Sequence, residues 1–430
     1  NLPKGNTILK LSAIGYKQKL LNIELLKDTN VVFILNPDDA LLDEVVISGT
    51  LSEISKRNSA IPIEVYSSAY LNKVPVPSLL EATQNINGVR PQLNCAVCNT
   101  GDIHINGMEG PYTMITIDGM PIVGGLSTVY GLQGIPGSLL QRVEVVKGPA
   151  STIYGSEAVA GLINVITKDV YSAPKLSFNL SSTSWREIQT DLMFKFLEDK
   201  KVSGIIGIDY HNYSLPIDNN DDNFTDLTLK DRISVFNKLN LKRKDDKIAT
   251  LTTRYLYEDR WGGEMQWTPE FRGGDSVYGE SIYTNRAEIM LRYQLPGKEK
   301  LILSSSYSYH NQNSVYGTLS YNAIQQIGFS QLVWHKDLNL KHKLLSGIAI
   351  RYNYYDDNTS ATEIFDGISL NNPDKWILPG VFIQDKYCVS EKLDILTGIR
   401  LDYHLAHGSV FSPRTNIKWS PNKNTSLRLG

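Results

Sequence analysis

The chain has 430 residues, a formal net charge of −2, 20% charged residues and a mean hydropathy of −0.22. This balance offers no basic footprint for a nucleic-acid partner, and no run reaches the roughly 18 apolar residues of a membrane helix. A helical membrane protein is therefore excluded. A transmembrane β-barrel is not excluded, because its lipid-facing and lumen-facing residues alternate and average out in hydropathy.

The first fifty residues predict short strands followed by one extended segment. Strands are expected at residues 7–11 and 31–35, on either side of an Ile14-Gly15-Tyr16 turn. The sequence opens inside a domain without a signal peptide, so we expect it to continue upstream. Residues 42–50 form a β-branched run suited to adding a strand to a partner's sheet, the alternatives being a plain edge strand or a linker.

Residues 51–170 carry mixed helix and strand signals. A helix is predicted at 78–83 and a second helical turn at 138–142. A strand at 112–117 is closed by a tight Asp118-Gly119 turn. Farther on, charges alternate with valines over 142–147, before a Gly-Pro break and a Tyr-Gly turn.

Three of these pieces resemble the plug of TonB-dependent outer-membrane receptors and occur in the same order. They are residues 112–121 (YTMITIDGMP), 142–149 (RVEVVKGP) and 154–168 (YGSEAVAGLINVITK). The resemblance implies an α/β plug inside a transmembrane barrel, with charges that pair across the plug or with the barrel wall at Arg142, Glu144, Lys147 and Glu157. The alternative is solvated charges on a small α/β domain. Asn106-Gly107 stands where the family usually has Arg-Gly, which weakens the transfer of that arginine's ionic role.

Beyond residue 175 the apolar period becomes two. Ile348, Ile350, Tyr352 and Tyr354 share one face of a strand, and 395–403 repeat the pattern. These runs predict strands with lipid on one face and the lumen on the other. Connections at 296–298, 390–392 and 421–423 are tight, whereas 212–230, 258–285 and 356–375 are long. Such asymmetry is typical of periplasmic and extracellular barrel ends, although a soluble β-sandwich can alternate similarly.

The predicted fold is therefore an all-β transmembrane barrel with an α/β plug and part of a small N-terminal β-sandwich. The resemblance implies four segments: 1–40, part of a carboxypeptidase-regulatory-like sandwich as in Bacteroidota receptors; 41–50, a TonB box; 51–170, the plug; 171–430, the first part of the barrel. About twelve or thirteen strands are expected here, against 22 in the family barrel, so we expect a fragment of a longer protein.

The resemblance also implies partners and a location. The TonB box would bind TonB, with its inner-membrane energising complex, through Asp43, Glu44, Val45, Val46 and Ile47. The chain would be a multi-pass barrel in the outer membrane of a Gram-negative bacterium, in contact with its lipid. A surface lipoprotein is a further partner in some relatives.

Ligand contacts are expected where the plug's apical loops face the long outer loops. The plug candidates are Cys95, Cys98, Asp102, His104, Met108, Glu109, Tyr112, Ser127 and Tyr130. We expect Cys95 and Cys98 to form a disulfide that stiffens the loop. The alternative is a copper site, since Cys95, Cys98, His104 and Met108 offer soft ligands.

Two predicted outer loops carry further candidates. Asp218, Asn220 and Asp222 offer alternating oxygen ligands that suit a structural calcium ion, the alternative being a solvated acidic loop. The other loop holds rings and a guanidinium that either stack on a flat ligand or pack the loop: Trp261, Trp267, Arg272 and Tyr278.

The sequence contains no catalytic motif, so we predict a transporter that needs no cofactor. The leading hypothesis is TonB-dependent import of a scarce metal chelate: a ferric siderophore, haem or cobalamin. The alternatives are a copper importer, a glycan or peptide importer with a lipoprotein lid, and a plug–barrel scaffold that does not transport. The lidded importers usually carry Lys-Asp-Ala-Ser and Tyr-Gly-Ser-Arg-Ala-Ala-Asn-Gly stretches, from which residues 147–161 depart.

Overall fold

The computed structural model describes residues 5–11, 19–25, 45–49, 51, 54–71, 73, 76, 78–95, 100–122, 126, 130–149, 152–199, 201–365, 369–422 and 425–430. Within these ranges, no helix is long and apolar enough to cross a membrane.

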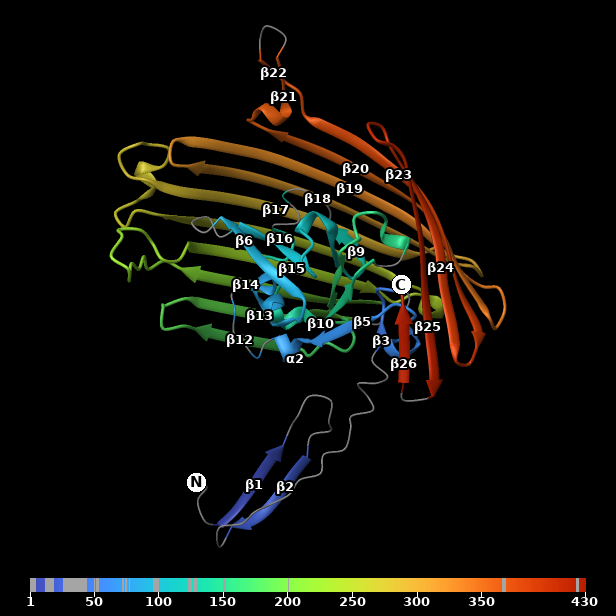
Figure 1. The fold of residues 1–430 in the computed structure, drawn as a ribbon. Helices are drawn as coiled ribbons and strands as arrows, with labels where there is room; N and C mark the ends of the chain where they lie inside the picture. Colours follow the sequence, from blue (N-terminus) through green and yellow to red (C-terminus); the bar gives the residue numbers. More distant parts are fainter. Residues whose placement is uncertain are drawn as a thin grey trace.

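The N-terminal residues form a small hairpin that lies apart from the rest of the molecule (Figure 1). Strand β1 (Gly5–Leu11) pairs antiparallel with β2 (Lys19–Leu25), which confirms the strand predicted at 7–11. The strand predicted at 31–35 lies outside the described residues. A second short pair, β3 (Val45–Val46) and β4 (Ile54–Ser55), leads into the next unit.

Strands between Ile63 and Thr167 build a five-stranded sheet in the order β5-β10-β11-β8-β9. The β11–β8 pair is parallel and the other neighbours are antiparallel. A separate hairpin joins β6 to β7. The bounds are β5 (Ile63–Ser67), β6 (Val89–Cys95), β7 (Thr100–Ile105), β8 (Thr113–Ile117), β9 (Met120–Ile122), β10 (Leu140–Lys147) and β11 (Gly161–Thr167).

Short helices connect these strands. They are α2 (Ser68–Leu71), α3 (Leu79–Ala82) and the 3-10 turns η1 (Lys56–Asn58), η2 (Thr83–Asn85), η3 (Gly110–Tyr112), η4 (Gly137–Leu139) and η5 (Thr152–Tyr154). The helix predicted at 78–83 is confirmed: Ser78 Oγ accepts from the backbone N–H of Glu81 at 3.3 Å, an N-cap for α3.

The helical turn predicted at 138–142 is wrong beyond Leu139. Strand β10 begins at Leu140, because its backbone pairs with β11 on one side and with β5 on the other. These two ladders outweigh the local helical preference. The Asp118-Gly119 turn is confirmed, with φ values of 50° and 79°. A backbone with two positive φ angles suits a two-residue hairpin.

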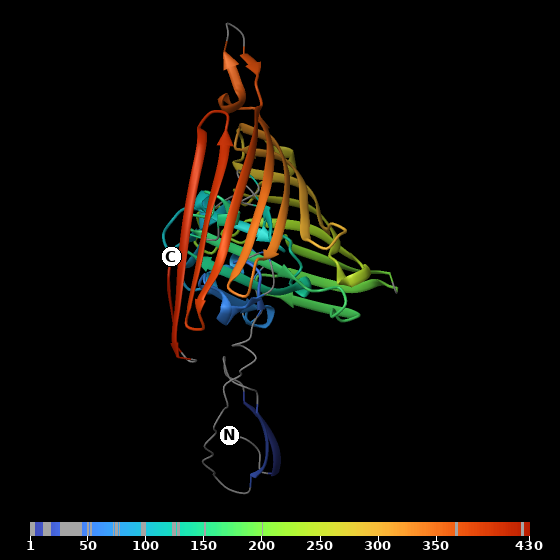
Figure 2. The same ribbon diagram turned by 90° about the vertical axis from the view of Figure 1, so that its right-hand side faces the viewer.

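A single 13-stranded antiparallel sheet follows, with its strands in chain order. Two short strands, β21 (Glu363–Phe365) and β22 (Ser369–Asn371), are not part of it and form a separate hairpin. Its strands are β12 (Leu176–Ser182), β13 (Ile188–Glu198), β14 (Val202–Tyr213), β15 (Leu229–Leu241), β16 (Ala249–Gly263), β17 (Gly279–Gln294), β18 (Lys300–Tyr316), β19 (Leu319–Asp337), β20 (His342–Asp357), β23 (Asp374–Ser390), β24 (Leu393–His404), β25 (Gly408–Asn422) and β26 (Thr425–Leu429). Figures 1 and 2 show this large sheet curving around the smaller unit, which is the part of the chain that holds the five-stranded sheet and its short helices.

The predicted register of the large sheet is confirmed. Ile348 is 59% exposed and Ile399 is 46% exposed on the outer face, whereas Ala349 and Arg400 are buried on the inner face. The three predicted long connections are present at one end of the sheet, but 317–318 and 405–407 at the same end are tight, so the predicted alternation holds only in part. One of the long connections is shorter than expected, at 264–278, since β16 continues to Gly263 and β17 begins at Gly279. Its turn is η7 (Pro269–Phe271), and the tight connection between β15 and β16 holds η6 (Lys244–Asp246).

The third long connection carries its own structure. It holds η8 (Ser360–Thr362) and a hairpin of β21 (Glu363–Phe365) and β22 (Ser369–Asn371), which projects beyond the large sheet in both views (Figures 1 and 2).

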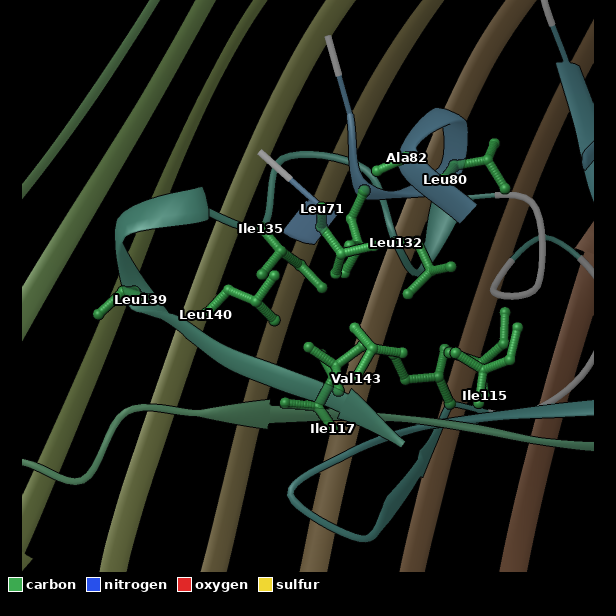
Figure 3. Close-up of a cluster of buried hydrophobic side chains, with 14 of the residues drawn as sticks. Leu71, Leu80, Ala82, Ile115, Ile117, Leu132, Ile135, Leu139, Leu140 and Val143 are labelled. Carbon is green, nitrogen blue, oxygen red and sulfur yellow. The ribbon is translucent and has the colours of Figure 1, made fainter. Parts of the chain in front are cut away.

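The main hydrophobic core lies inside the smaller unit and reaches the large sheet. Figure 3 shows part of it, with Leu71, Leu80, Leu132, Ile135 and Val143 converging. The same cluster continues to four side chains of the large sheet: Met193, Ile205, Phe236 and Met290. Apolar contact therefore helps to hold the smaller unit against the large sheet.

Candidate functional site

The described part of the predicted TonB box is bound to the sheet of the smaller unit. Glu144 Oε2 accepts hydrogen bonds from the backbone N–H of Ile47 and of Ser48, both at 2.9 Å. Val46 is fully buried in an apolar cluster, whereas Val45 is 39% exposed. Asp43 and Glu44 lie outside the described residues.

The four predicted plug charges all have partners. Arg142 Nη2 lies 2.8 Å from Glu144 Oε1, and Lys147 Nζ lies 2.7 Å from Glu64 Oε1. Glu157 Oε1 lies 2.5 Å from Nη1 of Arg351, which belongs to the large sheet. Two of these pairs lie within the five-stranded sheet, and of the four predicted charges only Glu157 pairs with the large sheet.

Glu64 shows how such pairs tune a carboxyl group. Burial alone would raise its pKa, but hydrogen bonds from Lys147 and Tyr66 outweigh burial and hold the pKa of Glu64 below its ordinary value. The carboxylate therefore stays charged, which keeps the β5–β10 contact ionic.

Basic residues of the large sheet donate to backbone carbonyl oxygens of the smaller unit. Arg400 Nη1 donates to Ile153 O at 2.8 Å, and Arg414 Nη2 donates to Gly155 O at 2.6 Å. Three further contacts follow the same plan: Arg254 to Gly131 O (2.8 Å), Lys386 to Asn58 O (2.8 Å) and Arg428 to Ser59 O (3.0 Å). Sequence reasoning missed these bonds, because a carbonyl acceptor carries no residue signature. The available signal was the arginines on inward-facing strand positions.

The Asp118-Gly119 turn also contacts the wall. Asp118 accepts from Thr167 N at 2.9 Å and from Lys238 Nζ at 3.0 Å. Burial alone would raise the pKa of Asp118, but the Lys238 ammonium and the Thr167 hydrogen bonds hold it below its ordinary value. Gly119 N donates to Asn164 Oδ1 at 3.0 Å, which ties the turn to β11.

The first predicted ligand loop is only partly described. Asp102 and His104 face each other on β7, with His104 Nε2 3.0 Å from Asp102 Oδ1. Met108, Glu109 and Tyr112 are exposed beside them. The side chain of Cys95, all of Cys98 and Ser127 lie outside the described residues, so the disulfide and the copper set stay predictions.

Tyr130 occupies a buried position between the two units. It is 1% exposed, and its hydroxyl oxygen accepts a hydrogen bond from Arg260 Nη2 at 2.7 Å. The centre of its ring lies 4.9 Å from that of the His310 ring. Burial raises the pKa of Tyr130 to about 12, so the hydroxyl stays protonated. Contact between Tyr130 and a ligand therefore requires movement of the smaller unit.

The aromatic outer loop packs on itself. Trp267 is buried, with its ring 4.7 Å from that of Trp261. Arg272 Nη2 donates to Asn313 Oδ1 at 2.7 Å, and its guanidinium lies over the Tyr283 ring. Tyr278 is 40% exposed. Of the four loop candidates, it is the one with the largest share of its surface open to a ligand.

The acidic outer loop is closed by its own hydrogen bonds. Asp218 accepts from the backbone N–H of Asp222 and Asn223, and Asp222 accepts from Phe224 N at 2.8 Å. Asn220 Nδ2 also donates to Asp222 Oδ2 at 3.0 Å. Among the described residues, no group of three His, Cys, Asp or Glu side chains is placed to hold a metal ion. Calcium binding stays a prediction.

Comparisons with known proteins agree with this architecture. Residues 55–162 match the TonB-dependent Receptor Plug Domain, and residues 196–430 match the TonB dependent receptor-like beta-barrel. The iron-regulated outer membrane virulence protein of Vibrio cholerae serotype O1 is 24% identical over 339 residues, covering 75% of this chain and 49% of the relative.

Two solved structures share the fold at low identity. The siderophore receptor PirA of Pseudomonas aeruginosa is 16% identical with a TM-score of 0.60, covering 85% of this chain and 63% of that one. The siderophore receptor PiuA of Acinetobacter baumannii is 15% identical with a TM-score of 0.64, covering 89% and 65%.

The chain spans about half the length of the curated relative that it matches. The barrel match alone covers more than half of this chain, and the plug match precedes it in the order that the fold requires. The smaller unit is thus a plug and the large sheet a barrel wall, and the chain belongs to the TonB-dependent receptors of the outer membrane.

Proposed function

We propose that the protein imports a ferric siderophore across the outer membrane, driven by TonB. The observation that carries the proposal is the plug itself, seated in the curve of the wall and tied to it by ionic contacts and hydrogen bonds from at least seven barrel cations. Such bonds re-form with water or with new partners when the plug moves. A plug sealed only by apolar contact would lack that freedom.

The choice of an iron chelate rests on similarity. One curated relative is named as iron-regulated, and both solved structures above are named as siderophore receptors. The plug ending at residues 147–161 also departs from the stretches typical of lidded glycan and peptide importers. These features together favour a small metal chelate over a glycan or a peptide.

Energy coupling would pass through residues 43–47. An extended segment can add a strand to a TonB sheet, because its backbone N–H and C=O groups pair without regard to side-chain identity. In the structure Val45 and Val46 already adopt strand geometry, paired with β4. A partner strand would replace β4 in that role.

Uptake in cells tests the substrate. Cells that lack the receptor gene and carry the full-length gene on a plasmid should recover growth in iron-limited medium on a ferric siderophore, but not on haem. Cobalamin-dependent growth should be unaffected. Recovery on haem or cobalamin alone would contradict the proposal.

Binding to the purified receptor tests the site. Replacement of Glu109 or Tyr112, which are exposed on the plug, should weaken ferric siderophore binding about tenfold or more, as expected for loss of one or two good contacts. The matched control is Glu198→Gln, an exposed residue at the end of β13 beside the tight turn into β14. Equal affinity in all variants would remove these residues from the site.

A further inference from the structure

One oxygen atom of Glu144 binds the last residue of the predicted TonB box, Ile47, and the residue after it, Ser48. The Glu144 side chain is fully buried in the middle of β10. Oε2 accepts from Ile47 N at 2.9 Å, from Ser48 N at 2.9 Å and from Ser48 Oγ at 2.7 Å. Three donors from two consecutive residues fix the backbone of this segment against the plug sheet. Hydrogen bonds to a charged group are about twice as strong as neutral ones.

The other oxygen of Glu144 is compensated from within the plug. Arg142 donates to Oε1 through Nε at 2.9 Å and through Nη2 at 2.8 Å. A buried carboxylate that lost its only partners would be strongly unfavourable. Because Arg142 stays in place, the segment can leave without stranding an unpaired charge, and water can enter in its place.

The apolar part of this contact is small. Val46 is buried in an apolar cluster that includes Ile61 and Ile63, whereas Val45 is 39% exposed. One buried valine supplies only part of the free energy that holds the segment. Besides the β3–β4 ladder, the three bonds to Glu144 are the specific restraint that ties this segment to the plug sheet.

Asn164 links the same contact to the rest of the plug. Its Nδ2 donates to Ser48 Oγ at 3.1 Å, and its Oδ1 accepts from Gly119 N at 3.0 Å and from Thr116 Oγ1 at 2.7 Å. Thr116 and Gly119 belong to β8 and its closing turn. Strand β8 spans about 17 Å and begins directly after the exposed Tyr112. A shift of β8 would thus reach Ser48 through one side chain.

We propose that Glu144, Ser48 and Asn164 form a latch that keeps the TonB-binding segment on the plug and releases it when β8 moves. The latch rests on the coupling role proposed above for residues 43–47. Glu144 is a positioning residue: it touches the segment and the plug, and neither the ligand nor TonB. Glu64 on the neighbouring strand β5 also forms an ion pair with a plug cation, Lys147, and its hydrogen bonds go to Lys147 and Tyr66 instead of the segment, which makes it the control.

Amide hydrogen exchange in the ligand-free, full-length receptor tests the latch, since two of its donors are the amides of Ile47 and Ser48. Glu144→Gln should speed exchange at residues 45–49 about tenfold or more, because it weakens bonds to a charged acceptor. Ser48→Ala should speed it less, and should add little in the Glu144→Gln background, since both changes act on one restraint. Glu64→Gln should leave these amides unchanged.

Exchange at β8 and β11 shows whether each variant keeps its plug folded. If Glu144→Gln unfolds the plug, Ser48→Ala still tests the latch, because it removes one hydroxyl. Unchanged exchange at residues 47 and 48 in a folded Glu144→Gln or Ser48→Ala plug would overturn the proposal. Binding of the soluble TonB domain tests the coupling role separately: faster exchange without stronger TonB binding would keep the latch and refute the assignment of residues 43–47.

Discussion

Arg400 shows at the residue scale how the barrel holds the plug. It donates to Ile153 O of the plug and, through Nε and Nη2, to both oxygens of Asp402 at 2.7 Å. The Asp402 carboxylate fixes the guanidinium, which leaves one N–H aimed at a backbone acceptor. Because that acceptor is a carbonyl group, no substitution in the plug can remove it.

Replacing Arg400 with alanine should destabilise the receptor by about 3–5 kcal/mol, since it leaves Asp402 buried and unpaired. Lys336→Ala, which breaks an exposed pair with Glu299, should cost far less, because solvent screens that pair. Denaturant unfolding of both variants in detergent measures the difference. Removing both charges, as in Arg400→Met with Asp402→Leu, should recover part of the loss. Equal stability of the two alanine variants would refute this role for Arg400.

The ion pair of Asp118 predicts that the stability of the plug depends on pH. The pKa of Asp118 is lower in the folded plug than in the unfolded chain, because Lys238 and Thr167 outweigh burial. Its stabilisation is therefore complete above the unfolded value of about 4 and is lost as pH falls through the folded value. Asp118→Asn should lower the free energy of unfolding at pH 7, and the gap to wild type should close in acid. Exposed Asp275→Asn serves as control, and a gap that does not change with pH would contradict the pairing.

At the scale of elements, strands with strict alternation were predictable and contacts distant in sequence were not. The faces of β20 and β24 follow from period two alone, because each residue on a strand points opposite to its neighbours. The residue at which β10 begins could not be predicted from the local pattern, because the strand pairs with β5 and β11, which lie far from it in the chain. Glu144 was predicted as a plug ion pair, but its bond to Ser48 joins positions 96 residues apart, which no local pattern reveals.

The wall provides a prediction at this scale. Ile348→Arg places a charge on the lipid face and should impair assembly by roughly 2–4 kcal/mol near mid-bilayer. The sequence suggests Ala349→Arg or Gly398→Arg as tolerated controls, but the structure rules them out: Ala349 is buried, and a Cβ at Gly398 would lie 2.6 Å from Thr152 Oγ1 of the plug.

Leu378→Arg is the better control, because Leu378 lies half-buried on the inner face of β23. Heat-modifiable migration of outer-membrane fractions reports the folded yield of each variant. Equal yields for Ile348→Arg and Leu378→Arg would contradict the assigned faces.

For the whole molecule, the plug and wall make two kinds of contact. Around Leu139 the contact is apolar and close: a Cβ at Gly207 of the wall would lie 2.4 Å from Leu139 Cδ1. Elsewhere, barrel cations donate to plug carbonyl groups. The sequence predicted charges that pair across the plug or with the wall, and it did not predict the apolar contacts. Apolar clusters join the plug to β13–β15 and β17 on one side and to β19, β20, β23 and β24 on the other, so a plug movement would break apolar as well as polar contacts.

The most direct test of TonB-dependent import is deletion of residues 43–47 from the full-length receptor. Ferric siderophore should still bind at the cell surface with unchanged affinity, because the plug's exposed face and the barrel are untouched. Accumulation of iron inside the cells should fall to the level of cells without TonB. Uptake that survives the deletion would contradict the account.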